Sequence, residues 1–148
     1  MDMFSHILLP IDGSRFSMKA AKAGIALARR LGAKVTAYIA IDPVPYAFYA
    51  EGAPADEPAL VALERRARAT AQKYVQAVAR AARAAGVTCQ SVVEIAVPSE
   101  GILAIARKRK CDTVFMGSHG RRGVKRFLLG SVTSRVLAKA DRPVIVYR

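Results

Sequence analysis

The sequence predicts one α/β domain over residues 1–148, with a parallel sheet and helices on both of its faces. Short apolar runs rich in β-favouring residues alternate with longer segments whose apolar residues recur at helical spacing. This alternation is typical of βαβ units, in which right-handed crossovers join parallel strands. A chain of 148 residues with 53% hydrophobic side chains can build such a core and is too apolar to be disordered.

The first elements are two strands separated by a helix. The apolar run from Phe4 to Leu9 predicts a strand, and Ser14 or Ser17 is expected near the N-cap of the helix that follows. Gly32 ends this helix, and Val35 to Ile41 predicts the second strand. The inner face of the helix is expected to carry Ala20, Gly24, Leu27, Ala28 and Leu31.

The remaining elements follow a segment from Asp42 to Pro58 that contains four prolines and is predicted to be a loop or lid. A long helix ending at Gly86 is expected to turn Leu60, Leu63, Ala67, Ala71, Tyr74, Val78 and Ala82 inward. After it we predict a strand from Val87 to Ile95, a helix opened by Pro98-Ser99-Glu100, a strand from Thr113 to Met116, a helix from Ser131 to about Lys139 and a strand from Val144 to Tyr147.

A glycine-punctuated loop before the helix at Ser131 carries the main functional signal. Its glycines allow tight turns and a close approach of the backbone to a ligand; they are Gly117, Gly120, Gly123 and Gly130. We expect Ser131 to be the N-cap of a helix whose inner face holds Val132, Val136 and Leu137. A helix N-terminus favours anions, and the loop has no acidic residue but contains His119, Arg121, Arg122, Lys125 and Arg126. These features together predict a phosphate cradle.

The spacing of the loop excludes two common phosphate motifs. In the P-loop pattern a glycine stands at the sixth position, which is Arg122 when the count starts at Gly117, and the dinucleotide pattern GxGxxG is absent. The pattern G-2x-G-9x-G-S, from Gly117 to Ser131, instead resembles the nucleotide-binding signature of the universal stress protein family, in its ATP-binding branch. The resemblance extends to the opening Ile7-Leu8-Leu9-Pro10-Ile11-Asp12-Gly13-Ser14 and to the closing Arg142-Pro143-Val144-Ile145-Val146.

This resemblance implies a doubly wound sheet of five strands in the order 3-2-1-4-5 and a homodimer formed through the C-terminal strand Val144–Tyr147. It also implies ATP as the ligand, with Mg²⁺ or Mn²⁺ and no metal ligand from protein side chains. By resemblance, Pro10 and Asp12 border the adenosine, Ile39 meets the adenine, Met116 and Gly117 lie on the ribose side, and Gly120, Gly130, Ser131, Val132 and Thr133 hold the phosphates. Arg121, Arg122 and Lys125 are candidate cations beside the phosphates.

Asp12 and His119 each have a second interpretation. Asp12 can be a turn residue that bonds the backbone near Ser14, although its place after a strand favours a ribose contact. Ser118 and His119 suggest a triad with Asp12, but the G-x-S-x-G elbow is missing, so we interpret His119 as a loop residue near the phosphates.

The function expected from these residues is a nucleotide-binding module for stress-response signalling, with at most slow hydrolysis or self-phosphorylation. The alternative is a basic nucleic-acid-associated protein, because the net charge is +13 and Arg107-Lys108-Arg109-Lys110 forms a cationic run. We favour a solvated helix end for that run, since cations complement the C-terminal end of a helix. An adenylyl-transferring enzyme is disfavoured because the turn Ile11-Asp12-Gly13-Ser14 is too short for a pyrophosphate loop.

A cytoplasmic protein without membrane spans is expected. The longest stretch without a charged residue has ten residues, Ala84 to Val93, whereas a span needs about 18. The opening Met1-Asp2-Met3 lacks the basic region of a signal peptide. Cys89 and Cys111 have no metal-binding or CxxC spacing and are expected to be reduced, buried small side chains.

Overall fold

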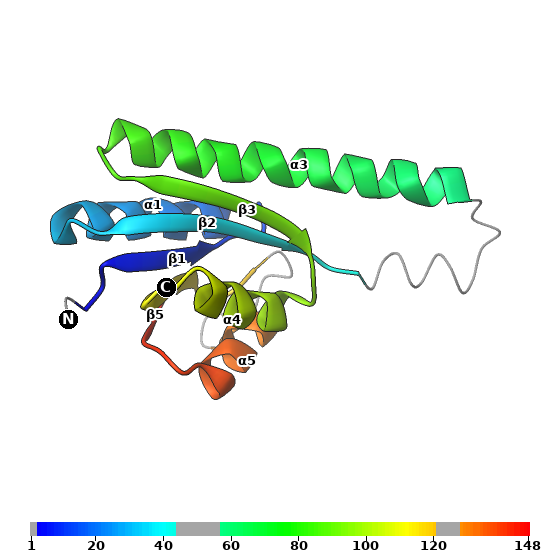
Figure 1. Cartoon of the computed structure of the whole chain (residues 1–148). Helices are drawn as coiled ribbons and strands as arrows, with labels where there is room; N and C mark the ends of the chain where they lie inside the picture. Colours follow the sequence, from blue (N-terminus) through cyan, green and yellow to red (C-terminus); the bar gives the residue numbers. More distant parts are fainter. Residues whose placement is uncertain (1–2, 44–56, 121–127) are drawn as a thin grey trace.

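The protein is a parallel five-stranded sheet with helices on both faces (Figure 1). The structure, a computed structural model, describes residues 3–43, 57–120 and 128–148. The strands are β1 (His6–Pro10), β2 (Lys34–Ile41), β3 (Cys89–Ile95), β4 (Thr113–Gly117) and β5 (Val144–Tyr147). The helices of the described ranges are α1 (Arg15–Leu31), α3 (Glu57–Ala84), α4 (Pro98–Lys108) and α5 (Ser131–Lys139). The strand order β3-β2-β1-β4-β5 confirms the predicted fold class and order.

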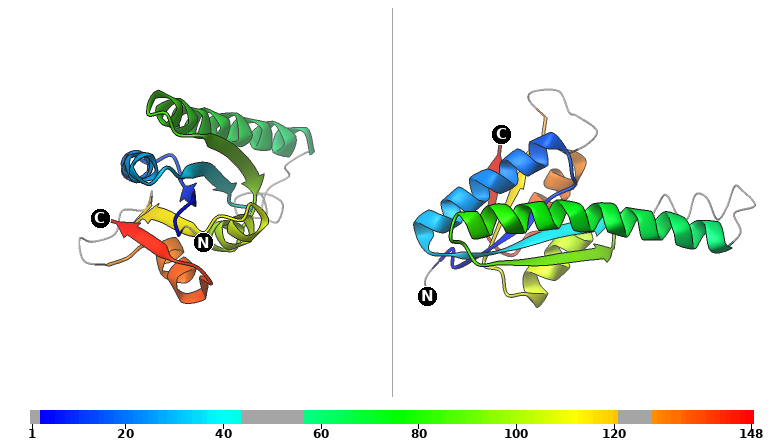
Figure 2. Two further views of the ribbon diagram at one scale, coloured as in Figure 1. Left: turned by 60° about the vertical axis from the view of Figure 1, so that its left-hand side comes forward. Right: turned by 90° about the horizontal axis from the view of Figure 1, so that it is seen from above.

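Two hydrophobic clusters fill the space on either side of the sheet. Alternate residues of β1 point to opposite faces, so that Ile7 and Leu9 pack under α1 and α3 while Leu8 packs under α4 and α5. All three of these side chains are fully buried. The helices therefore form one layer of α1 with α3 and another of α4 with α5, as the two views of Figure 2 show. This layering leaves the carboxyl ends of the strands as the edge where a ligand can approach.

Several predicted boundaries and inner positions need correction. Gly130, not Ser131, is the N-cap of α5, and Pro58 lies inside α3 rather than in the preceding loop, most of which is outside the described residues. Residues placed on inner faces but found exposed are Leu31 at 48%, Leu63 at 36% and Leu137 at 40%. Leu31 and Leu137 lie in the last turns of α1 and α5, and Leu63 lies in the part of α3 that projects beyond the sheet. The helical spacing of apolar residues continues at these positions, but no neighbouring element covers the side chains.

The long helix α3 is buried only in its second half. With 28 residues it is about 42 Å long at 1.5 Å per residue, whereas the seven residues of β3 span about 23 Å. Ala71 is the first residue of α3 that is buried, and the part before it projects beyond the sheet (Figure 1). Neither α3 nor any other described helix is apolar enough along its length to cross a membrane.

A buried polar cluster closes the amino ends of the central strands. The ring of His6 is 4% exposed, and its Nε2 lies 2.8 Å from Thr36 Oγ1 and 3.6 Å from Cys111 Sγ. Asp112 braces this edge by accepting hydrogen bonds from the main-chain N–H groups of Ser5 and His6 at 2.8 and 3.1 Å. Burial lowers the pKa of His6, and nearby Lys34 lowers it further, against an opposing effect of Asp112.

The buried position of His6 predicts loss of stability under mildly acid conditions. Because the folded-state pKa is depressed, the unfolded chain binds more protons as pH falls below its ordinary value of about 6.5. The stability that the neutral ring contributes is therefore present above that pH and is lost as pH falls toward the folded pKa. Urea unfolding between pH 8 and 5 should show a slope for this group of at most about 1.4 kcal/mol per pH unit. His6→Gln should remove that part of the slope, and identical slopes in both proteins would contradict the prediction.

Candidate functional site

The candidate site lies where the carboxyl ends of β1 and β4 meet. These strands are neighbours in the sheet, with Ile7 opposite Thr113 and Leu8 opposite Val114. The chain leaves β1 into α1 on one face and leaves β4 toward α5 on the other face. Divergence of the connections opens a crevice at such a point of an α/β sheet. The turn after β1 and the loop after β4 therefore lie side by side at the candidate site.

The turn after β1 is fixed by hydrogen bonds among short polar side chains. Asp12 Oδ1 accepts from the N–H of Ser14 at 2.9 Å, and Ser14 Oγ accepts from the N–H of Ser17 at 3.1 Å as the N-cap of α1. Ser17 Oγ in turn accepts from the N–H of Asp12 at 3.2 Å and donates to Ser14 O at 3.1 Å. Asp12 therefore does act as a turn residue that bonds the backbone at Ser14, and it does so through Oδ1.

The other oxygen of Asp12 faces the loop that follows β4. A Cβ atom placed on Gly120 would lie only 2.4 Å from Asp12 Oδ2, so the loop backbone passes directly against the carboxylate. A side chain at Gly120 would displace either the carboxylate or the loop. The structure therefore brings together Asp12 and Gly120, which are far apart in the sequence, at the mouth of the crevice.

The amino end of α5 is anchored beside this contact. The N–H of Gly130 donates to Ser118 O at 2.7 Å, and Thr133 Oγ1 donates to Gly117 O at 2.9 Å. A Cβ atom on Gly130 would lie 3.1 Å from His119 Cα and 3.3 Å from Ser118 O, so the two backbone segments lie almost in contact. Both bonds hold the start of α5 against the end of β4.

This anchoring decides which groups of α5 can meet an anion. The N–H of Gly130 and the hydroxyl of Thr133, a residue 2% exposed, are already bonded within the protein. Gly130 provides no side-chain cap for the helix. The first N–H groups of a helix have no partner inside it. The main-chain N–H groups of Ser131, Val132 and Thr133 are accordingly the candidate anion donors at the start of α5, where the helix dipole also favours negative charge.

An aromatic wall, not anticipated from the sequence, closes one side of the loop. The ring of Phe16, in the first turn of α1, stacks on His119 with centroids 3.9 Å apart and an interplanar angle of 16°. Tyr147 at the end of β5 lies 5.9 Å from Phe16, and its main-chain oxygen accepts from the N–H of Ser118 at 2.8 Å. Phe16 could have been suspected from the sequence because it directly follows the Asp12 turn; the contribution of Tyr147 depends on strand pairing.

His119 is held by this wall and by its neighbour. Its Nδ1 lies 3.1 Å from Ser118 Oγ, while its ring face is covered by Phe16. The stacking also leaves little room at Gly117, where a Cβ atom would lie 2.9 Å from Phe16 Cε1. The arrangement fits a residue that shapes the loop better than one that attacks a substrate.

The other predicted site residues are buried or lie outside the described ranges. Pro10, Ile39 and Met116 are buried, and the side chains of Ile39 and Met116 belong to the hydrophobic core. The cation candidates Arg121, Arg122, Lys125 and Arg126, together with Gly123, lie outside the described residues.

Solved structures of similar shape include proteins with bound adenine nucleotides. A universal stress protein crystallised in complex with cAMP aligns over 99% of this chain and 98% of its own, with a TM-score of 0.71 and 19% identity. The universal stress protein of Archaeoglobus fulgidus in complex with dAMP aligns over 100% of both chains, with a TM-score of 0.65 and 18% identity. At these identities the likeness is one of fold.

Other relatives share a higher sequence identity with this chain. A universal stress protein of Methanocaldococcus jannaschii is 33% identical over 147 residues, which cover 99% of this chain and 84% of the relative. The structure of the universal stress protein UspA from Lactobacillus plantarum has a TM-score of 0.85 and 25% identity, over 99% of each chain. Residues 3–148 match the profile of the universal stress protein family. The chain belongs to the universal stress protein family.

Proposed function

We propose that the protein binds ATP and acts as a nucleotide-binding module in stress-response signalling. The observation that carries this proposal is the juxtaposition of the uncapped start of α5, the glycine backbone at Gly120 and the carboxylate of Asp12 at the carboxyl edge of the sheet. A polyphosphate needs main-chain donors and close access to the backbone, and a ribose needs a hydrogen-bond acceptor. The cAMP and dAMP complexes of proteins with this fold support an adenine nucleotide as the ligand.

In this proposal the ligand lies across the ends of β1, β2 and β4. The N–H groups of Ser131, Val132 and Thr133 bind the phosphates together with the backbone at Gly120 and Gly130, two glycines that let the loop pack against Asp12 and His119. Asp12 accepts from the ribose hydroxyls near Pro10, Met116 and Gly117, and the main chain at Ile39 meets the adenine. Arg121, Arg122 and Lys125 supply further positive charge, a role that remains a prediction.

A divalent ion would enter with the phosphates. Within the described ranges no group of three or more His, Cys, Asp or Glu side chains converges as a metal site. Mg²⁺ commonly keeps several waters and binds through phosphate oxygens, so an ion held mainly by the nucleotide fits this donor set. We propose Mg²⁺ or Mn²⁺ in that position.

Catalysis is proposed to be slow at most. General-base attack of water on a phosphate requires a basic group free to reach the water. His119 is the nearest imidazole of the loop, and it is stacked on Phe16 and bonded to Ser118. This supports a binding protein with weak hydrolysis or self-phosphorylation rather than a fast enzyme.

The protein is further proposed to be a cytoplasmic homodimer. The strand β5 (Val144–Tyr147) stands at one edge of the sheet, and an edge strand offers main-chain groups that a second copy can pair across a twofold axis. Both cysteines are free thiols, which suits a reducing compartment.

The test is to look for the nucleotide directly. Purified protein should be denatured and its supernatant separated by anion exchange, with mass identification of any adenine nucleotide. In parallel, equilibrium dialysis with ATP and Mg²⁺ should give an affinity on the order of micromolar, which corresponds to about −8 kcal/mol. Competition by ADP, AMP and cAMP then ranks the ligands. Absence of retained nucleotide together with no binding in dialysis would overturn the proposal.

A further inference from the structure

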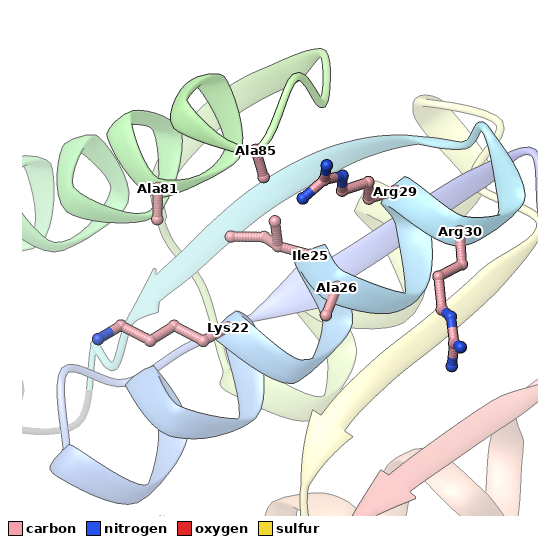
Figure 3. Close-up of a pocket in the computed structure, with 7 residues that line it drawn as sticks. All are labelled: Lys22, Ile25, Ala26, Arg29, Arg30, Ala81 and Ala85. Carbon is pink, nitrogen blue, oxygen red and sulfur yellow. The ribbon is translucent and has the colours of Figure 1, made fainter.

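A groove between α1 and α3 lies apart from the nucleotide site. It has a volume of about 690 Å³ and is lined by Lys22, Ile25, Ala26, Arg29, Arg30, Ala81 and Ala85 (Figure 3). Ile25 points into the space between the two helices, and Ala81 and Ala85 of α3 face the same space (Figure 3). Because Ile25 is only 4% exposed, the accessible apolar lining of the groove is mainly alanine, and α1 adds three cations to it.

Topology places this groove toward the opposite edge of the sheet from the candidate site. Helix α1 starts at the carboxyl end of β1 and runs back to Gly32, just before β2 begins. Helix α3 likewise runs back to Gly86, before β3 begins, so Ala81 and Ala85 lie near the amino ends of the strands. A ligand in this groove would not compete with a nucleotide at Gly120 and Gly130.

The charged residues that line the groove are all positive. Helix α1 contains five cations and no acidic residue, and α3 contains six cations and no acidic residue after Glu64. The ion pairs found in the described ranges involve Arg68, Arg107 and Arg142, and none involves Lys22, Arg29 or Arg30. The groove cations are thus available to an acidic partner.

We propose that this groove binds an acidic amphipathic helix of a partner protein. Residues Lys22, Ile25, Ala26 and Arg29 follow the spacing i, i+3, i+4 and i+7, so the exposed Ala26 and the edge of the largely buried Ile25 lie between two cations about 10.5 Å apart along the axis of α1. A helix with an apolar stripe flanked by carboxylates two turns apart complements this face. Docking of an amphipathic helix into an apolar groove is a common mode of recognition.

The same features disfavour other polyanions and a second copy of the chain. The seven lining residues include no aromatic side chain on which a base of single-stranded nucleic acid could stack, and the apolar lining offers nothing to a phosphate backbone. Two copies with a net charge of +13 each would repel one another at a cationic groove. Charge complementarity therefore selects an acidic polypeptide.

The test uses a fluorescein-labelled synthetic helix of about five turns, with Leu and Ala at i, i+3, i+4 and i+7 and Glu on both flanks. Its binding to the full-length protein is followed by fluorescence anisotropy. The double variant Lys22→Gln, Arg29→Gln should weaken binding about tenfold or more, because the glutamates on both flanks of the peptide lose the cations with which they pair. The matched double variant Lys108→Gln, Lys139→Gln removes the same charge from the α4–α5 layer and should change binding less than about twofold. Equal effects of the two variants, or no peptide binding, would overturn the proposal.

An uncharged substitution in the lining of the groove distinguishes a peptide ligand from a nucleic-acid ligand. Ala26 is exposed, so Ala26→Gln should fold normally, as circular dichroism can verify, while placing a polar amide in the apolar lining of the groove. We expect about fivefold weaker peptide binding and no change in the binding of a duplex DNA of similar charge, which depends on phosphate contacts. Peptide binding that is insensitive to Ala26→Gln would contradict a helix seated on this lining. DNA binding that exceeds peptide binding and is lost in the Lys22, Arg29 variant would assign the groove to nucleic acid instead.

Discussion

Replacing Gly130 by aspartate is expected to lower the affinity for ATP by at least about 100-fold while leaving the fold intact. Gly130 is the N-cap of α5, and aspartate is among the residues most favoured at that position. The new carboxylate would accept hydrogen bonds from the N–H groups of Val132 and Thr133, two of the donors proposed for the phosphates. Losing two charge-assisted hydrogen bonds of about 1.5–3 kcal/mol each accounts for the size of the effect.

Equilibrium dialysis measures this change, and Gly130→Asn is the matched control for shape. The amide has nearly the same size and can also cap the helix, but it carries no charge to repel a phosphate. A side chain of either kind must also fit 3.1 Å from His119 Cα, so asparagine should weaken binding as well, though less. Full affinity in the aspartate variant, with an unchanged circular dichroism spectrum, would rule out the N-terminus of α5 as the phosphate site.

Gly101→Ala is expected to destabilise the fold by about 2 kcal/mol, even though alanine is the better helix former. A Cβ atom at Gly101 in α4 would lie 2.2 Å from Tyr38 Oη and 3.0 Å from Ala96 Cβ. Tyr38 cannot move away easily, because it is 1% exposed and its hydroxyl donates to Glu94 Oε1 at 2.7 Å. Burial and this hydrogen bond also raise the pKa of Tyr38, so the phenol stays protonated and keeps its bond.

A double-mutant cycle with Tyr38→Phe isolates this contact. Removing the hydroxyl leaves the ring carbon Cζ at 3.3 Å as the nearest atom of residue 38, which needs only a small adjustment. The cost of Gly101→Ala should therefore fall in the Tyr38→Phe background, giving a coupling free energy of about 1 kcal/mol or more in urea unfolding. Additive effects of the two substitutions would show that the phenolic oxygen does not set the packing of α4.

The fold could be predicted because its signals are local. Apolar runs such as Ile7-Leu8-Leu9 are buried on both faces of a parallel sheet, and glycines such as Gly32 end helices in the left-handed conformation with φ 66°. The errors arose where burial depends on a distant element. Leu63 follows the helical period of its neighbours, but the sheet does not extend beneath it, and length alone shows this only once β3 is placed beside α3.

The location of the candidate site could be predicted from the sequence, but not which of its groups are already bonded within the protein. The spacing of Gly117, Gly120 and Gly130 predicts a loop that approaches a ligand closely; the structure shows that the backbone at Gly120 and Gly130 packs tightly against Asp12 and His119. The sequence does not reveal that the hydroxyl of Thr133 is taken by Gly117 O. The contacts of Phe16 with His119 and Tyr147 also require the tertiary structure, because they join three elements distant in the chain.

The central claim is that main-chain N–H groups at the start of α5 bind the phosphates of a nucleotide. Titration of ¹⁵N-labelled protein with ATP and Mg²⁺, followed by amide chemical shifts, tests it most directly. The largest shifts are expected at Ser131, Val132 and Thr133, with little change at Gly32, which lies at the far end of α1. Saturating ATP that leaves those three amides unmoved would contradict the claim.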